Sequence, residues 1–118
     1  MSDNPEILIV LSTVPSVETG KSIAHILIEK KLAACVNILP SLESVYEWEG
    51  KIEESAEALL IIKTTTESYE SLETEILSNH PYDVPEIIAL PVTKGLKPYL
   101  EWVRSNTDKK NAGEDIKP

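Results

Sequence analysis

Cysteine and glycine are scarce in this 118-residue sequence, and each scarcity excludes a class of site. The one cysteine, Cys35, cannot form a disulfide within the chain, which is typical of proteins from a reducing compartment. The four glycines lie far apart, so no glycine-rich phosphate-binding loop is present. The sequence also has no apolar run long enough to cross a membrane and no basic start typical of a signal peptide. We therefore expect a cytoplasmic protein that has no membrane partner.

Positive charge is also in short supply. The chain has 11 lysines and arginines against 20 aspartates and glutamates, which gives a net charge of -9. Binding to nucleic acid rests on a basic surface, so we expect no nucleic-acid partner.

The length fits a single domain, which we place at residues 1–107. The charged segment at 108–118 has no periodicity and is predicted to be a disordered tail.

The longest patterned stretch runs from Cys35 to Lys63 and predicts a β-hairpin that reverses at Glu49-Gly50. Apolar and polar residues alternate along both arms, as expected of strands with one buried face. The arm that ends at Trp48 would span roughly 43 Å, whereas a compact domain of this size is about 35 Å across. The tip, with Tyr46 and Trp48, should therefore overhang its own domain and contact another subunit.

The remaining periodicities predict two strands and three helices around this hairpin. The first is a strand at Ile7 to Leu11, followed by a helix capped by Ser16 and running to about Lys31. The second helix is entered through a capping box at Thr64 and Glu67, although Thr65 or Thr66 could cap it equally well, and is ended by His80-Pro81. A strand at Glu86 to Val92 and a short helix at Pro98 follow. The order is β-α-β-β-α-β plus a C-terminal helix, an α+β fold of the ferredoxin-like, split β-α-β type. Right-handed crossovers place the first and third strands in the centre of the sheet. Both faces of these strands are apolar, but two helices cover only one, so a homo-oligomer is expected.

Five segments taken together resemble the CutA family, the divalent-cation tolerance proteins. They are Lys31 to Ile38 (KLAACVNI), Tyr46 to Glu53 (YEWEGKIE), Ile62 to Thr65 (IKTT), His80 to Ile87 (HPYDVPEI) and Tyr99 to Trp102 (YLEW). The resemblance implies a ferredoxin-like subunit in a homotrimer built like the PII nitrogen-regulatory proteins. It also implies binding of copper or another divalent metal ion and a part in metal-ion response and homeostasis, with no obligatory cofactor.

Two residues stand out as metal ligands. Cys35 is the only soft ligand and would suit copper or zinc together with an imidazole, although its position equally suits a small buried apolar residue. His80 could offer copper a nitrogen ligand beside the carboxylate of Glu86, or it could cap the preceding helix as a cation. The other histidine, His25, is expected to lie on a helix surface or in packing. The hairpin glutamates either hold hard cations or form a solvated face.

The resemblance also associates copper ligation with a cysteine in the first strand and with a cysteine or histidine just before His80. Ser12 and Asn79 occupy these positions in this chain. A hydroxyl and an amide replace thiolate and imidazole poorly as soft-metal ligands. We therefore expect any copper site to be weak and to use His80.

Lys63 is the most suggestive basic residue. A PII-like trimer would place it near an intersubunit cleft with Tyr82, Glu86 and Trp102, where it could meet an anion; the alternative is a lysine that extends from the sheet edge into solvent. No nucleophile with a base and no paired carboxylates are legible, so we do not expect an enzyme. Two functions remain: divalent-metal homeostasis, or a PII-like signalling or scaffold trimer that binds a metabolite or a protein partner at the cleft.

Overall fold

The computed structural model describes residues 6–107 and has the predicted element order. The elements are β1 (Ile7–Val14), α1 (Val17–Glu29), β2 (Cys35–Trp48), β3 (Lys51–Thr65), α2 (Tyr69–Asn79), β4 (Ile88–Pro91) and α3 (Lys97–Ser105). The four strands form one antiparallel sheet in the order β2-β3-β1-β4, so the central placement of the first and third strands is confirmed. The predicted boundary between a domain at 1–107 and a tail at 108–118 stays a prediction, because the tail lies outside the described residues.

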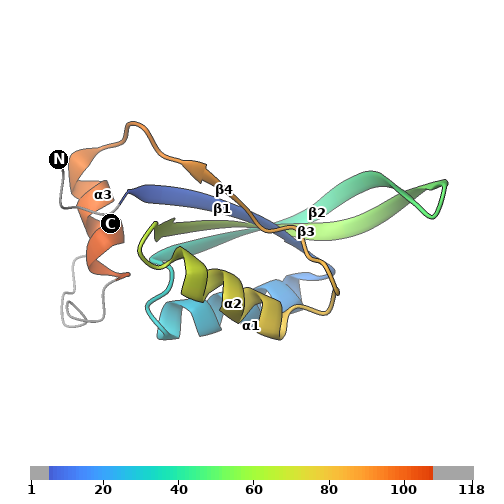
Figure 1. The fold of residues 1–118 in the computed structure, drawn as a ribbon, viewed down its shortest axis with the longest axis horizontal. Helices are drawn as coiled ribbons and strands as arrows, with labels where there is room; N and C mark the ends of the chain where they lie inside the picture. The colour runs from blue at the N-terminus through green and yellow to red at the C-terminus, as the bar shows by residue number, and fades with distance from the viewer. Residues whose placement is uncertain (1–5, 108–118) are drawn as a thin grey trace.

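The helices α1 and α2 lie side by side against one face of the sheet, and α3 lies at the end of the sheet where β1 begins (Figure 1). Between the sheet and α1 and α2 is the hydrophobic core. Its fully buried members include Val10, Val14, Ile23, Leu27, Leu60, Ile62, Leu72 and Ile76. The central strands β1 and β3 contribute alternate residues to this core, as a period of two requires.

The entry to α1 follows the sequence closely. Ser16 is the N-cap, and its side-chain oxygen accepts a hydrogen bond of 3.1 Å from the backbone N–H of Thr19. One turn into the helix lies Gly20, where a Cβ atom would come within 3.0 Å of Leu60 Cδ2 and 3.3 Å of Val14 Cγ2. The missing side chain therefore lets α1 approach the sheet closely, which offsets the low helix propensity of glycine.

The predicted hairpin is confirmed, and it extends well past the rest of the sheet. β1 ends at Val14, which pairs with Ala58, so most of the hairpin beyond this pair has strand neighbours only within itself (Figure 1). The turn residues Glu49 and Gly50 have φ angles of 51° and 79°, the left-handed conformation that a tight hairpin turn requires. The longest dimension of the chain is 47 Å, against 28 and 23 Å across. The part of the hairpin beyond the Val14–Ala58 pair is therefore an arm that extends from the compact body of the sheet.

Two sequence predictions about element ends are wrong. The N-cap of α2 is Ser68, with no side-chain capping bond, whereas Thr64 and Thr65 belong to β3. The Thr64 hydroxyl donates a hydrogen bond of 2.6 Å to the carbonyl oxygen of Leu32, and the Thr64 backbone pairs with β1. These bonds hold Thr64 in the strand, so it cannot cap the helix. The last strand is also shorter than the predicted range of 86 to 92, because only Ile88–Pro91 pairs with β1. Pro91 is tolerated since β4 is an edge strand.

Candidate functional site: the open sheet face and the loop after α2

The sheet face turned away from α1 and α2 is apolar. Strand alternation and the pairing register place on it Ile9, Leu11, Leu59, Ile61, Lys63, Cys35, Asn37, Leu39, Ile88 and Leu90, and we call this set the open face. Among residues 6–107 no helix covers its middle (Figure 1), and Leu39, Ile88 and Leu90 are 45%, 52% and 50% exposed. A contiguous apolar surface of this kind marks an interaction site.

Lys63 is the one charged side chain of the open face. Its register partner on β2 is Cys35, and its ammonium donates a hydrogen bond to the Oδ1 atom of Asn37. The only ion pair found within residues 6–107 joins Lys30 to Glu75, so Lys63 has no carboxylate partner in the described part of the chain. The face therefore carries one uncompensated positive charge beside a half-buried thiol.

α3 closes one end of the open face. Ile7 and Thr65, which precede Ile9 and follow Lys63 on this face, are 3% and 2% exposed, and α3 packs against both of their strands. Burial raises the pKa of Tyr99, and the electrostatic effect of Cys35 raises this pKa further. The Tyr99 ring packs against Trp102 at a centroid distance of 5.7 Å. An aromatic wall thus borders the Cys35 and Lys63 end of the face.

His80 ends α2 and is held on both sides of its ring. Its Nε2 atom lies 2.8 Å from the carbonyl oxygen of Thr13, and its Nδ1 atom accepts a 3.1 Å hydrogen bond from the backbone N–H of Tyr82. Because Nδ1 accepts this bond, Nε2 is the ring atom whose N–H donates to the carbonyl oxygen of Thr13. The side chain is only 8% exposed. A metal ion could bind His80 only by displacing one of these two bonds.

Tyr82 follows His80 and ties the loop to the base of the hairpin. Its hydroxyl donates 2.8 Å to the Glu57 carboxylate, and its ring packs on His80 at a centroid distance of 4.7 Å. Burial, followed by the bond to Glu57 and its negative charge, raises the pKa of Tyr82 to about 12. The position of the loop therefore depends on contacts with β1 and β3.

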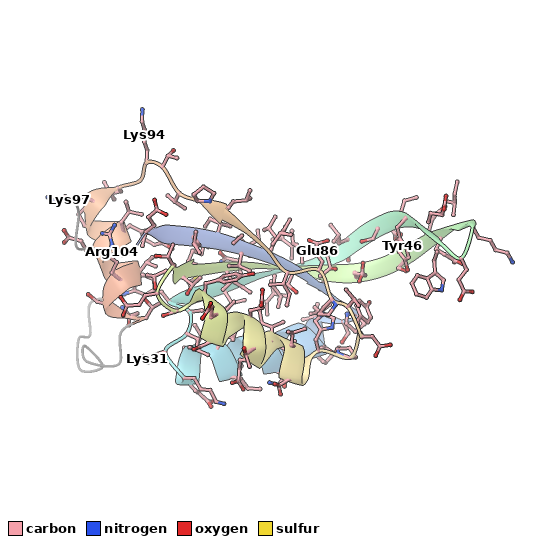
Figure 2. All side chains as sticks on the ribbon, viewed as in Figure 1. Lys31, Tyr46, Glu86, Lys94, Lys97 and Arg104 are labelled. Atoms are coloured by element: carbon pink, nitrogen blue, oxygen red, sulfur yellow. The ribbon has the colours of Figure 1, made fainter. Side chains whose placement is uncertain are left out.

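The three residues predicted to bind metal do not meet within this chain. Cys35 pairs with Lys63, whereas His80 contacts Thr13, whose partner is Leu59, so four residues of β3 separate the two sites by about 13 Å. Glu86 is exposed and lies where the chain approaches β4 (Figure 2). Within residues 6–107 no cluster of three histidine, cysteine or acidic residues is arranged to hold a metal ion.

A shallow cavity of about 510 Å³ lies beside His80 and includes a carboxylate that the sequence analysis missed. It is lined by Glu18, Thr19, Ser22, Ser78, Asn79, His80 and Pro81. Glu18 lies in the first turn of α1, and this end of α1 meets the last turn of α2 because the two helices run antiparallel on one face. The predicted topology could have indicated this contact. The helix α1 begins where β1 ends, and α2 ends where the chain returns to β4, the neighbour of β1, so the start of α1 and the end of α2 lie close together.

The positions associated with metal ligation by the resemblance have other roles. Ser12 is fully buried on the core side of β1, and its hydroxyl has no hydrogen-bond partner among the described residues. Asn79 turns back into its own helix, where Nδ2 donates 2.8 Å to the carbonyl oxygen of Glu75. The ring nitrogens of His80 are bonded to Thr13 and Tyr82, and neither Ser12 nor Asn79 makes a hydrogen bond to them in the described part of the chain.

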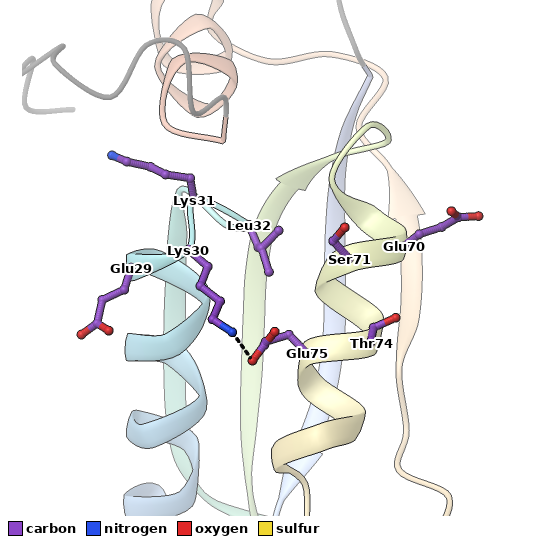
Figure 3. Close-up of a pocket in the computed structure, with 8 residues that line it drawn as sticks. All are labelled: Glu29, Lys30, Lys31, Leu32, Glu70, Ser71, Thr74 and Glu75. Carbon is purple, nitrogen blue, oxygen red and sulfur yellow. Dashed lines mark hydrogen bonds and ion pairs between the residues drawn. The ribbon is translucent and has the colours of Figure 1, made fainter.

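A larger cavity of about 870 Å³ lies between the end of α1 and the start of α2 (Figure 3). Lys30 and Glu75 reach across it and form an ion pair of 2.9 Å, while Glu29 and Glu70 point away from each other. Because its carboxylates do not converge, the cavity is a groove that an ion pair spans and not a cation site.

The end of the hairpin carries exposed apolar side chains, as expected of a tip that extends past its own domain. Trp48 is 62% exposed and Ile52 is 78% exposed. Tyr46 lies on the arm beyond β1 (Figure 2), where its hydroxyl makes a 2.8 Å hydrogen bond with the hydroxyl of Ser55. This arm offers large apolar groups to a neighbour at a distance from its own core.

Comparison with known proteins supplies the family. A family model described as CutA1 divalent ion tolerance protein matches residues 8–106. The chain is 50% identical over 99 residues to a divalent-cation tolerance protein CutA of Thermus thermophilus, covering 84% of this chain and 96% of that protein. It is 53% identical over 100 residues to a chloroplastic CutA protein of Arabidopsis thaliana, covering 85% of this chain but only 55% of the plant protein. The crystal structure of CutA1 from Oryza sativa superposes with a TM-score of 0.87 at 49% identity, covering 92% of this chain and 99% of that one. No helix among the described residues has the length and apolar character needed to cross a membrane.

Proposed function

The chain belongs to the CutA1 family of divalent-cation tolerance proteins, and from this membership we propose that it acts as a cytoplasmic homotrimer in the response to and homeostasis of divalent metal ions. Its relatives are named for tolerance of metal ions and not for a reaction, so the proposed activity is binding and not catalysis. Within the protein's own structure, the observation that carries the proposal is the open face, because an isolated subunit would leave it in water.

Self-association would cover the two apolar surfaces that the chain leaves exposed. Leu39, Ile88 and Leu90 are already about half-buried, so completing their burial would stabilise the assembly by roughly 1 kcal/mol for each side chain. The hairpin arm, with Tyr46 and Trp48, would reach past its own subunit and pack on a neighbour. Three copies around one axis would let each arm contact the next subunit in turn, because such head-to-tail contacts close into a ring.

Metal binding is proposed to use His80, with weak affinity for copper(II). Copper or another divalent ion would have to displace the N–H of Tyr82 from Nδ1, so loss of that bond opposes ligation. Glu18 lines the same cavity and would add a carboxylate, whereas Glu86 of the predicted set is not among the residues that line it. Cys35 could join only as the thiol of a neighbouring subunit, because about 13 Å of β3 separates it from His80 within one chain.

Native mass spectrometry during a copper(II) titration tests both parts together. A trimer that takes up a fixed number of ions would support the proposal, and His80→Gln should weaken that uptake by at least about tenfold. His25→Gln is the matched control, because His25 is exposed on α1 and is the only other histidine. A monomer at micromolar concentration would refute the assembly, and equal copper uptake in His80→Gln and His25→Gln would refute the role of His80.

A second candidate function is a PII-like signalling or scaffold trimer. It is favoured by one observation, the uncompensated ammonium of Lys63 at the border of the open face. The cleft proposed for this function brings Lys63 and Trp102 of one subunit near Tyr82 and Glu86 of another. A thermal shift caused by a metabolite in the absence of metal, and lost in Lys63→Gln, would favour this function over metal response.

A further inference from the structure

The end of the open face next to α3 is rich in hydrogen-bond donors and poor in acceptors. The Lys63 ammonium has three N–H donors and uses one of them on the Asn37 oxygen. The amide nitrogen of Asn37 has two more donors, and no other side-chain hydrogen bond of either residue is found within residues 6–107. The register partners of Lys63 are Cys35 and Ile9, neither of which carries an oxygen acceptor. The hydroxyl oxygen of Thr65, two residues along the same strand, already accepts a hydrogen bond from the backbone N–H of Ser68.

This arrangement carries a net positive charge in a protein whose net charge is -9. A cation on an apolar surface is costly to bury unless an opposite charge accompanies it. The chain supplies none at this point, because no ion pair of Lys63 is found in its described part. The unmet requirement is for a group with several oxygen acceptors and at least one negative charge.

We infer that Lys63 and Asn37 form the anchor of a binding site for a small oxyanion, a carboxylate or phosphate group of a free metabolite. The oxyanion accepts from the ammonium and from the Asn37 amide N–H, and the charge-assisted bond to Lys63 supplies most of the affinity. Asn37 holds the lysine in position through its oxygen while its nitrogen faces the ligand. This inference rests on the proposed assembly, because α3 forms a wall on only one side and a neighbouring subunit would close the other.

The residues around the anchor set the remaining selectivity. The helix α3 packs against β1 and β3 at this end and carries Tyr99 and Trp102, whose rings pack together, so the wall next to the oxyanion is aromatic. Such a wall accommodates a flat or apolar body attached to the anionic group. The half-buried thiol of Cys35 lies opposite Lys63 and limits the size of the group that the anchor accepts.

Isothermal titration calorimetry of the full-length protein tests this site with two probes, sodium phosphate and sodium oxalate, at constant ionic strength. Saturable binding of one probe is expected, and the one that binds distinguishes a phosphate from a carboxylate ligand. Asn37→Asp should weaken binding by at least about tenfold, because an aspartate of the same shape neutralises Lys63 internally. Lys63→Gln should do the same. Lys94→Gln is the matched control, since Lys94 is an exposed lysine in the loop before α3 and points away from the sheet (Figure 2).

Two results would overturn the inference. Absence of binding of both probes to the wild-type trimer at about 10 mM would mean that Lys63 is neutralised otherwise, for example by a carboxylate of a second copy. Equal binding to Asn37→Asp and Lys94→Gln would mean that the probe binds elsewhere. Copper uptake by the same samples separates this failure from that of the metal proposal. Asn37→Asp leaves His80 untouched, so its copper uptake and trimer mass should equal those of the wild type.

Discussion

Ser12→Ala is expected to stabilise the protein by about 1 to 2 kcal/mol. Ser12 lies in β1, and its side chain is fully buried between the sheet and the helices. Its hydroxyl has no hydrogen-bond partner in the described part of the chain. An unpaired buried hydroxyl costs about 1 to 3 kcal/mol. Removing the oxygen leaves a void of roughly 10 Å³, which at about 24 cal/mol per Å³ costs only about 0.2 kcal/mol. The released penalty therefore exceeds the packing that is lost.

Thr64→Val is the matched control, with an effect of opposite sign. Thr64 is equally buried on the core side of the neighbouring strand, but its hydroxyl donates 2.6 Å to the carbonyl oxygen of Leu32. Valine keeps the shape and removes the donor, so the Leu32 carbonyl loses this partner and stability should fall by about 1 to 2 kcal/mol. The two variants remove the same kind of atom from the same layer, and only the bonding differs.

The assay is urea unfolding followed by circular dichroism at one fixed subunit concentration. The concentration must be fixed because unfolding of an assembly depends on it. The midpoint should rise in Ser12→Ala and fall in Thr64→Val, with the dependence on urea unchanged. A lower midpoint in Ser12→Ala would refute the reasoning, because it would mean that the Ser12 hydroxyl makes a stabilising bond.

Three further outcomes follow from other parts of the fold. Trp48→Glu at the exposed end of the arm should raise the subunit concentration at which the assembly dissociates by at least about tenfold in dilution experiments, whereas Leu77→Glu on the outer side of α2 should leave it unchanged. Tyr82→Phe should remove the last tyrosine to ionise in an absorbance titration. The fold raises the pKa of Tyr82 from 10.0 to about 12. The contribution of the Tyr82 hydroxyl to folding stability is therefore complete below pH 10.0 and lost as the pH rises toward 12. Equal destabilisation of Tyr82→Phe at all these pH values would contradict this. Gly50→Ala should lower stability by about 1 kcal/mol through its left-handed φ of 79°, although no atom lies within 4 Å of the added carbon, and an unchanged urea midpoint would count against this strain.

Periodicity was sufficient to predict most of the fold. Alternation along the two arms and the polar turn at Glu49-Gly50 predicted the hairpin, and the continuous apolar run of Ile7 to Leu11 predicted a central strand, because these patterns depend only on neighbours in the sequence. The capping box at Thr64 failed since a long-range bond to Leu32 decides the role of that residue. Helix propensity alone also counts Gly20 as a weakness of α1, and only the distance to Leu60 explains why glycine is tolerated there.

The candidate sites were less predictable than the fold. Residue type drew attention to His80 and Lys63, but the bonds of His80 to Thr13 and Tyr82 depend on how α2 ends against β1. Asn37 was missed as a partner of Lys63 because the sequence alone does not determine the register of β2 against β3. That register places Asn37 diagonally opposite Lys63. The metal set of His80, Cys35 and Glu86 stays a prediction that concerns an assembly and not one chain.

The first and last described residues both contact the turn between β3 and α2. The Glu6 carbonyl accepts a hydrogen bond of 2.9 Å from the Thr66 N–H, and the Thr107 carbonyl accepts one of 3.2 Å from the Ser68 hydroxyl. The two ends of this segment are therefore neighbours, at the end of the sheet opposite the arm. A short linker would join them, and a circular permutant cut at the hairpin turn would carry its new termini at the far end of the 47 Å axis without interrupting any core element. Fused domains could then be displayed from the arm or from the body of the same fold.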